Sequence, residues 1–248
     1  MKYWLQCIEC GERYPRDSVI YRCGKCGGLL EVLYDYDRLR EGLEYEEIKR
    51  RSLSVWRYRE LLPIEKDTYR VSLGEGGTRL HRCKRLGNEL GVKNLWVKME
   101  GDNPTCSFKD RGMTVGISKA LEYGFRAVAC ASTGNTSASL GAYAAKAGLK
   151  GIILVPSGKV AKGKLAQAIA YGAEIFQVEG NFDEALRLVV ELSEKTGKVY
   201  LLNSINPYRI EGQKTLAFEV RDQLGRVPDL VILPVGNAGN ISALWKGF

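Results

Sequence analysis

The stretch Ala127-Val-Ala-Cys-Ala-Ser-Thr-Gly-Asn-Thr-Ser137 decides the fold predicted for this chain. Ala127–Ala131 is a short apolar run of the kind that forms a buried strand. Ser132–Ser137 supplies hydroxyl groups and a glycine, which are typical of a turn that leads into a helix. Small residues continue to Lys146, and a second apolar run follows at Gly151–Pro156. This order predicts two parallel strands joined by a helix.

The same alternation continues in both directions. Strands are expected at Val71–Thr78 (running into a glycine turn), Leu95–Glu100, Glu174–Val178, Val199–Leu202 and Leu230–Val235, and helices at Lys162–Tyr171, Phe182–Lys195 and Glu211–Leu224. Strands that read as unbroken apolar runs are covered on both faces of their sheet. The sequence therefore predicts an α/β fold of mostly parallel sheets with flanking helices.

A lysine stands at the start of another predicted helix. Asn103–Gly112 reads Asn-Pro-Thr-Cys-Ser-Phe-Lys-Asp-Arg-Gly, in which Asn-Pro marks a turn and Thr105 and Ser107 are residues of the kind that cap a helix. Apolar residues at helical spacing follow from Met113. Lys109 is therefore expected in the first turn, where unsatisfied N–H groups make the surroundings positive.

This position favours a reactive amine at Lys109. The positive field, with Arg111 nearby, disfavours the ammonium and favours the neutral, nucleophilic form that a Schiff-base lysine needs. The alternative is an ordinary solvated lysine, because the chain contains 37 Lys and Arg residues. Taken alone, the stretch favours that alternative.

Three polar segments are expected at strand ends, where ligands bind in open parallel sheets. Ser132–Ser137 is suited to hold a carboxylate, or is an ordinary helix-capping turn. Gly236–Asn240 has glycines that allow backbone N–H groups to converge on an anion. Asn203-Ser204 follows a third strand, and Arg209 is suited either to bind a phosphate or to lie on the surface.

The cysteines indicate a metal site near the N-terminus. Cys7, Cys10, Cys23 and Cys26 form two C-x2-C pairs, which together complete a tetrahedral zinc site. Two disulfides are the alternative, but no signal peptide is recognised, so zinc is favoured and the chain is expected to be cytoplasmic. Four thiolates leave no open position for water, so we predict a structural zinc ribbon.

Charge and apolar content exclude other classes of function. The chain has 45% hydrophobic and 27% charged residues, and its apolar runs are too short to span a bilayer. The net charge of +8 is spread out, without a block of like charges. Residues 1–33 hold five basic and four acidic side chains, and four thiolates on Zn²⁺ add −2, which makes a poor phosphate-binding surface. We therefore expect neither a nucleic-acid nor a membrane partner.

The remaining reactive residues do not form a recognisable catalytic set. His81 is the only histidine, which excludes a histidine metal cluster, and we expect it to be structural or exposed. Cys83, Cys106 and Cys130 lack paired spacing and are expected to be packed thiols.

Four ordered segments resemble the threonine synthase family. They are Asn103–Gly112, Ser132–Ser137, Asn206–Thr215 (Asn-Pro-Tyr-Arg-Ile-Glu-Gly-Gln-Lys-Thr) and Pro234–Asn240. The resemblance runs from about residue 71 to the end, and the cysteine pairs resemble an N-terminal extension of some microbial members. This family consists of pyridoxal-phosphate enzymes of the tryptophan-synthase-β fold type. Four motifs in the same order are far more specific than any one of them.

The resemblance implies a cofactor site and a substrate. Lys109 is expected to form a Schiff base with pyridoxal phosphate and to act as the catalytic residue, with Phe108 nearby and Asn135 bonded to the 3-hydroxyl of the cofactor. The cofactor phosphate is expected on Gly236, Asn237, Ala238, Gly239 and Asn240. The substrate implied is O-phospho-L-homoserine, which reacts with water to give L-threonine and phosphate. Its carboxylate is expected on Ser132, Thr133 and Thr136, and its phosphate on Asn203, Ser204 and Arg209.

The chain departs from the family pattern in two places. Cys106 stands where the lysine motif usually has glycine, and a positive φ there would strain the loop by about 1–3 kcal/mol. Family members also continue for several more strands and helices, including a Ser or Thr that faces the pyridine nitrogen. We therefore expect the chain to be a C-terminally truncated member.

The predicted organisation has three parts. Residues 1–33 are the zinc ribbon, 34–70 a connector of exposed helical segments, and 71–248 the catalytic region, within which 113–200 is expected to be a smaller, mobile subdomain. The resemblance also implies a homodimer. A serine/threonine dehydratase or a cysteine-synthase-like lyase is the rival activity, and a catalytically inactive zinc-ribbon binding protein is the rival from another class.

Overall fold

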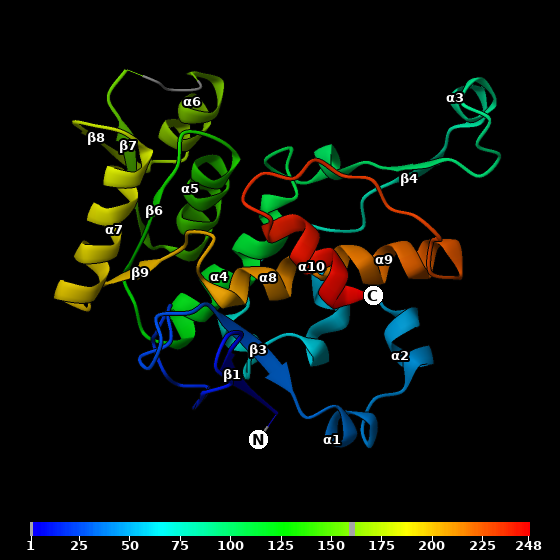
Figure 1. The fold of residues 1–248 in the computed structure, drawn as a ribbon, viewed down its shortest axis with the longest axis horizontal. Coiled ribbons are helices and arrows are strands. Elements are labelled where there is room, and N and C mark those ends of the chain that lie inside the picture. Colours follow the sequence, from blue (N-terminus) through cyan, green and yellow to red (C-terminus); the bar gives the residue numbers. More distant parts are fainter. Residues whose placement is uncertain (1, 159–161) are drawn as a thin grey trace.

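A four-stranded parallel sheet with the order β8-β7-β6-β9 forms one side of the molecule (Figure 1). The computed structural model describes residues 2–158 and 162–248. The strands are β6 (Ala127–Ala131), β7 (Lys150–Pro156), β8 (Glu174–Val178) and β9 (Val199–Leu201). All four agree with the predicted strands to within one residue at each end, so the predicted α/β fold is confirmed.

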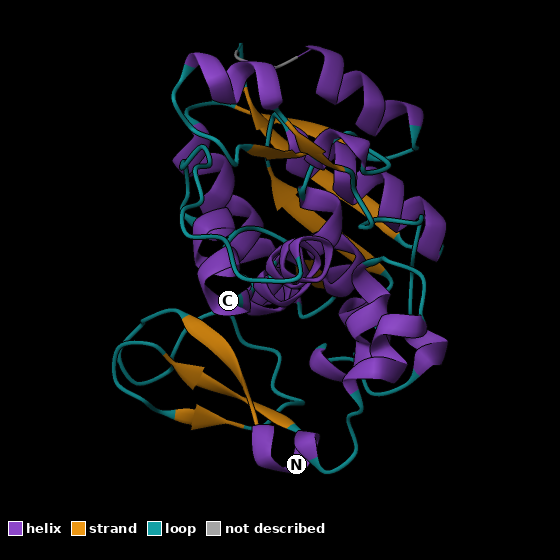
Figure 2. Ribbon diagram, turned by 90° about the vertical axis from the view of Figure 1, so that its right-hand side faces the viewer, coloured by secondary structure: helices purple, strands orange, loops and turns teal. Residues whose placement is uncertain are grey.

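Helices cover both faces of this sheet (Figures 1 and 2). They are α5 (Asn135–Ala147), α6 (Lys162–Ala170) and α7 (Phe182–Thr196). Helix α5 packs on β6 and β7 with α6 beside it, whereas α7 packs on β6, β7 and β9. A capping box between Asn181 and Glu184 starts α7, and Gly197 in the left-handed region ends it.

Four more helices form the centre of the molecule. They are α4 (Lys109–Glu122), α8 (Pro207–Gln213), α9 (Thr215–Leu224) and α10 (Gly239–Gly247). The prediction of one helix over Glu211–Leu224 is wrong. The side chain of Asn206 caps an earlier start and Pro207 occupies the first helical turn, while Lys214 separates α8 from α9.

A buried ion-pair network joins α4 to α9. Arg111 is fully buried and donates from Nη1 and Nη2 to Glu219 of α9 at 2.7 and 2.8 Å. Its Nε and Nη2 also donate to Glu100 at 2.7 and 2.8 Å, in the short helix η3 (Glu100–Asp102). Removing one partner from such a buried set costs about 3–5 kcal/mol, because the other charges remain buried without compensation.

The N-terminal cysteines belong to a separate three-stranded sheet and its turns, seen at the lower left of Figure 2. Its strands, in the order β2-β1-β3, are antiparallel: β1 (Tyr3–Cys7), β2 (Arg13–Tyr14) and β3 (Leu30–Tyr34). The segments that follow are α1 (Tyr36–Arg40), α2 (Tyr45–Arg50), η1 (Val55–Leu61) and η2 (Asp67–Tyr69). The expectation that these segments are exposed is wrong for η1, where Val55 and Trp56 are buried in the core.

Two predicted strands do not form. Val71 instead bonds to side chains of α4, because its N–H donates to Ser118 Oγ at 2.9 Å and its carbonyl accepts from Thr114 Oγ1. Leu230–Val235 is irregular, and no strand among the described residues pairs with it. The nearby strands β4 (Leu80–Arg82) and β5 (Trp96–Lys98), with α3 (Lys84–Glu89) between them, pair only with each other.

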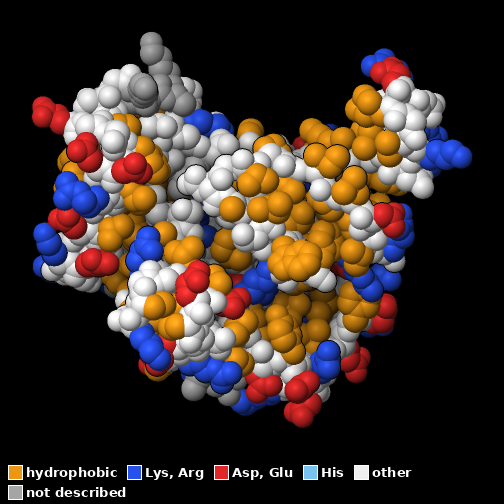
Figure 3. Space-filling view, in the orientation of Figure 1, with side chains coloured by type: hydrophobic (Ala, Val, Ile, Leu, Met, Phe, Trp, Pro, Cys, Tyr) orange, Lys and Arg blue, Asp and Glu red, His pale blue; other side chains and the backbone are white. Residues whose placement is uncertain are grey.

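Apolar side chains gather on the face that carries α9 and α10 (Figure 3). Trp245 is 85% exposed and Ile232 is 86% exposed, far more than is usual for residues of this size. Among the described residues, no helix is both long enough and apolar enough to cross a membrane.

Cys106 lies in the loop before α4 with a φ of +58°. The condition under which a cysteine would strain this loop, a positive φ, is therefore met. Its side chain is exposed, so the expectation of a packed thiol is wrong here, although Cys130 is fully buried and His81 is exposed as expected. A Cβ atom in the left-handed region costs roughly 1–2 kcal/mol, a cost that glycine avoids.

We expect Cys106→Gly to stabilise the fold. The relief of strain exceeds the extra entropy that glycine gives the unfolded chain, which leaves a net gain of about 0.5–1 kcal/mol in the free energy of unfolding. Chemical denaturation measures this free energy. Cys106→Ala is the control, because it removes the thiol but keeps the strain. Equal stability of the glycine and alanine variants would contradict the predicted relief of strain.

Candidate active site

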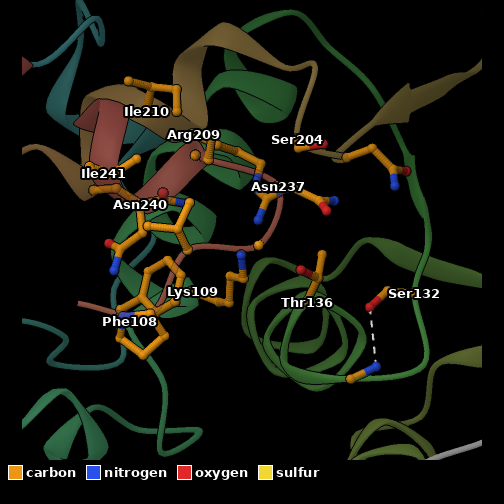
Figure 4. A pocket seen from close by; sticks show the side chains of 18 of the residues that line it. Phe108, Lys109, Ser132, Thr136, Ser204, Arg209, Ile210, Asn237, Asn240 and Ile241 are labelled. Atoms are coloured by element: carbon orange, nitrogen blue, oxygen red, sulfur yellow. Dashed lines mark hydrogen bonds between the residues drawn. The ribbon is translucent and has the colours of Figure 1, made fainter. Parts of the chain in front are cut away.

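A cavity of about 550 Å³ lies between the carboxyl ends of β6 and β9 and the starts of α4 and α10 (Figure 4). It is lined by the loops that follow these two strands, by α8 and by the segment before α10. The residues are Phe108, Lys109, Ala131, Ser132, Thr133, Gly134, Thr136, Phe182, Asn203, Ser204, Arg209, Ile210, Gln213 and Pro234–Ile241. Of the fourteen predicted site residues outside the cysteines, all but Asn135 line this cavity.

Lys109 is the first residue of α4, and its amine points into the cavity between Asn237 and Thr136 (Figure 4). Burial and the nearby charge of Arg209 lower the pKa of Lys109 to about 8. The amine lies 4.4 Å from the centre of the Phe108 ring. The expected shift toward a neutral amine is present, but Arg111 is not its cause, since Glu100 and Glu219 compensate that charge.

The loop that carries Lys109 is fixed by a buried carboxylate. Asp110 accepts from the N–H and the hydroxyl of Thr105 at 2.7 and 2.6 Å, and from Ser139 of α5 at 2.5 Å. Thr105 and Ser107 do not occupy the N-cap position, which belongs to Phe108. Ser107 nevertheless accepts from the N–H of Lys109 at 3.2 Å, so it satisfies one orphan donor of the first turn.

Arg209 is a buried cation without a carboxylate partner among the described residues. Its side chain is 3% exposed, Nη1 donates to the carbonyl of Leu202 at 3.0 Å, and Nε has no hydrogen-bond partner. Burial lowers the pKa of Arg209 to about 10. Because a buried, unpaired charge is costly, this guanidinium indicates an anion site.

The start of α10 supplies further groups for an anion. Ala238 has a φ of +54° and precedes the helix, so the left-handed position of this loop falls on an alanine and on neither neighbouring glycine. Two polar atoms here, Oδ1 of Asn240 and Oε1 of Gln213, are buried without a partner among the described residues. These two oxygens only accept hydrogen bonds and do not bind an anion. The donors that a phosphate requires are the first N–H groups of α10 and the guanidinium of Arg209, which line the same cavity.

The other predicted residues differ in how free they are to bind a ligand. Asn203 uses both ends of its amide on the backbone of Ala131, each at 3.0 Å, so it fixes β9 to β6. Ser132 accepts from the N–H of Gly134 at 3.2 Å. Asn135 is exposed at the start of α5 and does not line the cavity, so the structure does not bring it to the other site residues.

Sequence reasoning missed Gln213, Ile210 and Phe182. Gln213 lies in the Asn206–Thr215 segment, which carried part of the family resemblance. Its place in that segment is the sequence feature from which a site role could have been predicted. Phe182 lies one residue after the N-cap of α7 and lines the cavity. The sequence pattern predicted it only as a residue of a helix.

The four N-terminal cysteines form a second cluster. Their sulfur atoms all lie within 4.8 Å of one another, with 3.5 Å between Cys7 and Cys26 and 3.6 Å between Cys10 and Cys23. Four sulfurs about 2.3 Å from a central zinc ion lie about 3.8 Å apart, whereas a disulfide needs about 2.05 Å. The cluster is therefore compatible with zinc and contains no disulfide.

Comparison with known proteins defines the class. Residues 71–248 match the family described as pyridoxal-phosphate dependent enzymes. The chain belongs to this family. The threonine synthase of Methanocaldococcus jannaschii is 60% identical over 98% of this chain and 60% of its own length, and that of Methanosarcina acetivorans is 58% identical over 99% and 60%. The resemblance predicted from the four motifs is confirmed.

A solved structure gives the same fold. Threonine deaminase isoform 2 of Solanum lycopersicum, in its processed form, has a TM-score of 0.63 at 25% identity and is matched over 86% of this chain and 56% of its own. The chain spans about 60% of the length of the two threonine synthases above.

We expect the amine of Lys109 to react with acylating reagents half-maximally near pH 8, since only the neutral amine is nucleophilic and its pKa is lowered to about 8. Mass spectrometry of labelled peptides over a pH series measures this. Arg209→Met should move the midpoint to higher pH because it removes the neighbouring charge. Arg209→Lys keeps a cation and should move the midpoint less; identical midpoints in all three proteins would contradict the assignment.

Proposed function

We propose that this chain provides the cofactor-binding and phosphate-binding part of an enzyme that converts O-phospho-L-homoserine and water to L-threonine and phosphate. The observation that supports this most strongly is Arg209, a buried guanidinium without an acidic partner, in the cavity that contains Lys109. A substrate with a second phosphate, besides that of the cofactor, explains why a fixed positive charge is kept there. The names of the relatives point to the same reaction.

The residues of the cavity fit pyridoxal phosphate. Lys109 is the lysine that would bond to the cofactor, with Phe108 beside it, and Gly236, Asn237, Ala238, Gly239 and Asn240 would hold its phosphate. The start of α10, whose first N–H groups lie at the cavity wall, and the position of Lys109 in the same cavity are the observations that support this fit. When bound, pyridoxal phosphate supplies an electron sink for negative charge on the substrate carbon Cα.

The remaining groups bind and orient the substrate. Ser132, Thr133 and Thr136, at the start of α5, would hold the carboxylate, and Ser204 and Arg209 would hold the phosphate that leaves from Cγ. Asn203 would act by fixing the loop, because Ala131 occupies its amide. Asn135 was expected to bond to the 3-hydroxyl of the cofactor, but it is exposed and does not line the cavity, so its position does not support that role.

Lys109 would also move protons. A lysine with a pKa near 8 exchanges protons readily near neutral pH, as a base at Cα of the substrate and an acid at Cβ require. Its place at the helix start, held by Asp110 through Thr105 and Ser139, keeps the amine at one position in the cavity.

We further propose that Cys7, Cys10, Cys23 and Cys26 bind a structural zinc ion. The near-tetrahedral spacing of their sulfurs supports this, and so does the absence of any disulfide among the described residues. The ribbon at 1–33, the connector at 34–70, the catalytic region at 71–248, the mobile subdomain at 113–200, the homodimer and the cytoplasmic location stay predictions. Residue 1 and residues 159–161 of these ranges lie outside the described residues.

The test of the reaction uses the cofactor and three substrates. Incubation with pyridoxal phosphate and reduction with borohydride should place the pyridoxyl group on Lys109 in a peptide map. Turnover of O-phospho-L-homoserine should exceed that of threonine and O-acetylserine, which represent the rival dehydratase and cysteine-synthase activities. A pyridoxyl group on another residue, or on no residue, would refute the assignment of Lys109 as the cofactor-binding lysine.

A matched variant tests the phosphate site. Arg209→Met should weaken binding of O-phospho-L-homoserine by about 10- to 100-fold, the loss expected for hydrogen bonds to a charged group, while homoserine, which lacks the phosphate, should be unaffected. The variant should remain folded, because it removes a buried unpaired charge. An equal loss for both ligands would argue against a phosphate-binding role.

The test of the metal site uses a chelator. Dialysis against a strong zinc chelator should release about one zinc ion per chain and lower the melting temperature, since the metal closes the ribbon. Cys83→Ser, which alters a thiol outside the cluster, should leave the metal content unchanged, whereas Cys10→Ser should reduce it. A fold and metal content that the chelator does not alter would rule out zinc.

A further inference from the structure

Glu211 lies at a junction of three elements and has no role in the proposed reaction. Its side chain is fully buried on α8. Its Oε2 accepts from the hydroxyl of Tyr34 on β3 at 2.7 Å and from Lys214. Its Oε1 forms an ion pair with Lys246 Nζ on α10 at 2.9 Å, although the geometry of this contact is not that of a hydrogen bond. Lys246 also donates to the carbonyl of Val32 on β3. One carboxylate thus connects α8, α10 and the cysteine-bearing sheet.

The position of Glu211 on α8 links this junction to the anion site. Residues two positions apart point to nearly opposite sides of a helix. Arg209 and Gln213 line the active-site cavity, and Glu211, which lies between them in sequence, instead lines a second cavity of about 700 Å³ toward β3. The same short helix therefore presents its ligand groups to one side and its anchor to the other.

The polar junction, and not continuous apolar packing, holds α10 against the cysteine-bearing sheet. The second cavity separates Ile8 and Leu29 of that sheet from Trp245 of α10, and all three side chains are exposed. On its other side α10 approaches α8 and α9 closely, because a Cβ on Gly247 would lie 2.5 Å from the carbonyl oxygen of Lys214. The end of α10 is thus fixed by Lys246 and Gly247, six and seven residues after the Gly236–Asn240 loop at its start.

The charges of the junction support a fixed carboxylate. Burial raises the pKa of Glu211, but Lys214 and Lys246, with the hydrogen bonds from Lys214 and Tyr34, outweigh burial and lower it. Glu31 lies 3.6 Å from Lys246 and is the second acidic group of the junction. Two carboxylates therefore balance two ammonium groups, and neutralising Glu211 leaves one buried cation in excess.

We propose that Glu211 is a positioning residue, which with Tyr34 and Lys246 braces the Gly236–Asn240 loop so that the loop keeps the geometry that binds phosphate. The role of the loop as a phosphate site rests on the proposed function. The N-terminal sheet therefore serves the anion site as a support, through Tyr34 and the carbonyl of Val32, in addition to carrying the cysteines.

The test compares Glu211→Gln with the wild-type chain by hydrogen–deuterium exchange without any cofactor. Peptides covering 236–247 should exchange about tenfold faster, because the buried ion pair between Glu211 and Lys246 of α10 is lost, while peptides covering 127–156 stay unchanged. Tyr34→Phe, which removes one hydrogen bond and keeps the ring, should show a smaller effect of the same kind. Glu191→Gln, which alters a partly exposed carboxylate paired with Arg187 and Lys195 on α7, is the control and should change neither region.

A second readout separates positioning from general destabilisation. The ratio of affinities for pyridoxal phosphate and pyridoxal should fall about tenfold in Glu211→Gln, because only the phosphate uses the braced loop. Where Glu211→Gln fails to fold, Glu211→Gln/Lys214→Met restores the charge balance and takes its place. Unchanged exchange at 236–247, or an equal rise throughout the chain, overturns the proposal. Failure of the wild-type chain to bind pyridoxal phosphate refutes the proposed function instead, and the exchange data still decide this inference.

Discussion

The buried guanidinium of Arg111 is the constraint on which the rest of the structure depends. A fully buried charge is tolerated only when its partners satisfy it, and here Glu100 and Glu219 do so with four hydrogen bonds. Burial lowers the pKa of Arg111, but the two carboxylates outweigh burial and raise it. Because the partners come from η3 and α9, the network fixes the direction of α4, and Lys109 stands only two residues before Arg111 in that helix. The placement of the reactive amine thus follows from an interaction that faces away from the cavity.

A comparison of Arg111 with Arg209 separates structure from function. Both are buried arginines, yet Arg209 meets only the carbonyl of Leu202 and keeps an unpaired Nε among the described residues. No carboxylate offsets the charge of Arg209, while that charge helps to lower the pKa of Lys109. Residue type cannot distinguish these two roles. They differ in whether the fold brings a carboxylate from a distant element close to the guanidinium, as it brings Glu219 to Arg111.

This distinction also explains how far the sequence could predict the molecule. The strands Ala127–Ala131 and Glu174–Val178 were predicted because continuous apolar runs between turns are local signals. Leu230–Val235 carries the same signal and remains irregular, because a strand also needs a neighbour to pair with. The cavity was largely predictable because its residues follow strand ends, but Asn135 was not, since one step along a helix turns a side chain by about 100° and out of the site.

Several unfavourable features of the chain gather around one cavity, and this supports the cavity as a working site. Among the described residues, Cys106 and Ala238 are the only non-glycine residues with positive φ, and they lie in the loops that carry Lys109 and begin α10. Arg209, with its unpaired Nε, and the half-buried Lys109 line the same cavity. Strain and desolvation distributed at random would be scattered over the core. Strained and desolvated groups are expected to gather at the ends of β6 and β9 if binding of an anion and of a covalently held cofactor offsets their unfavourable free energy.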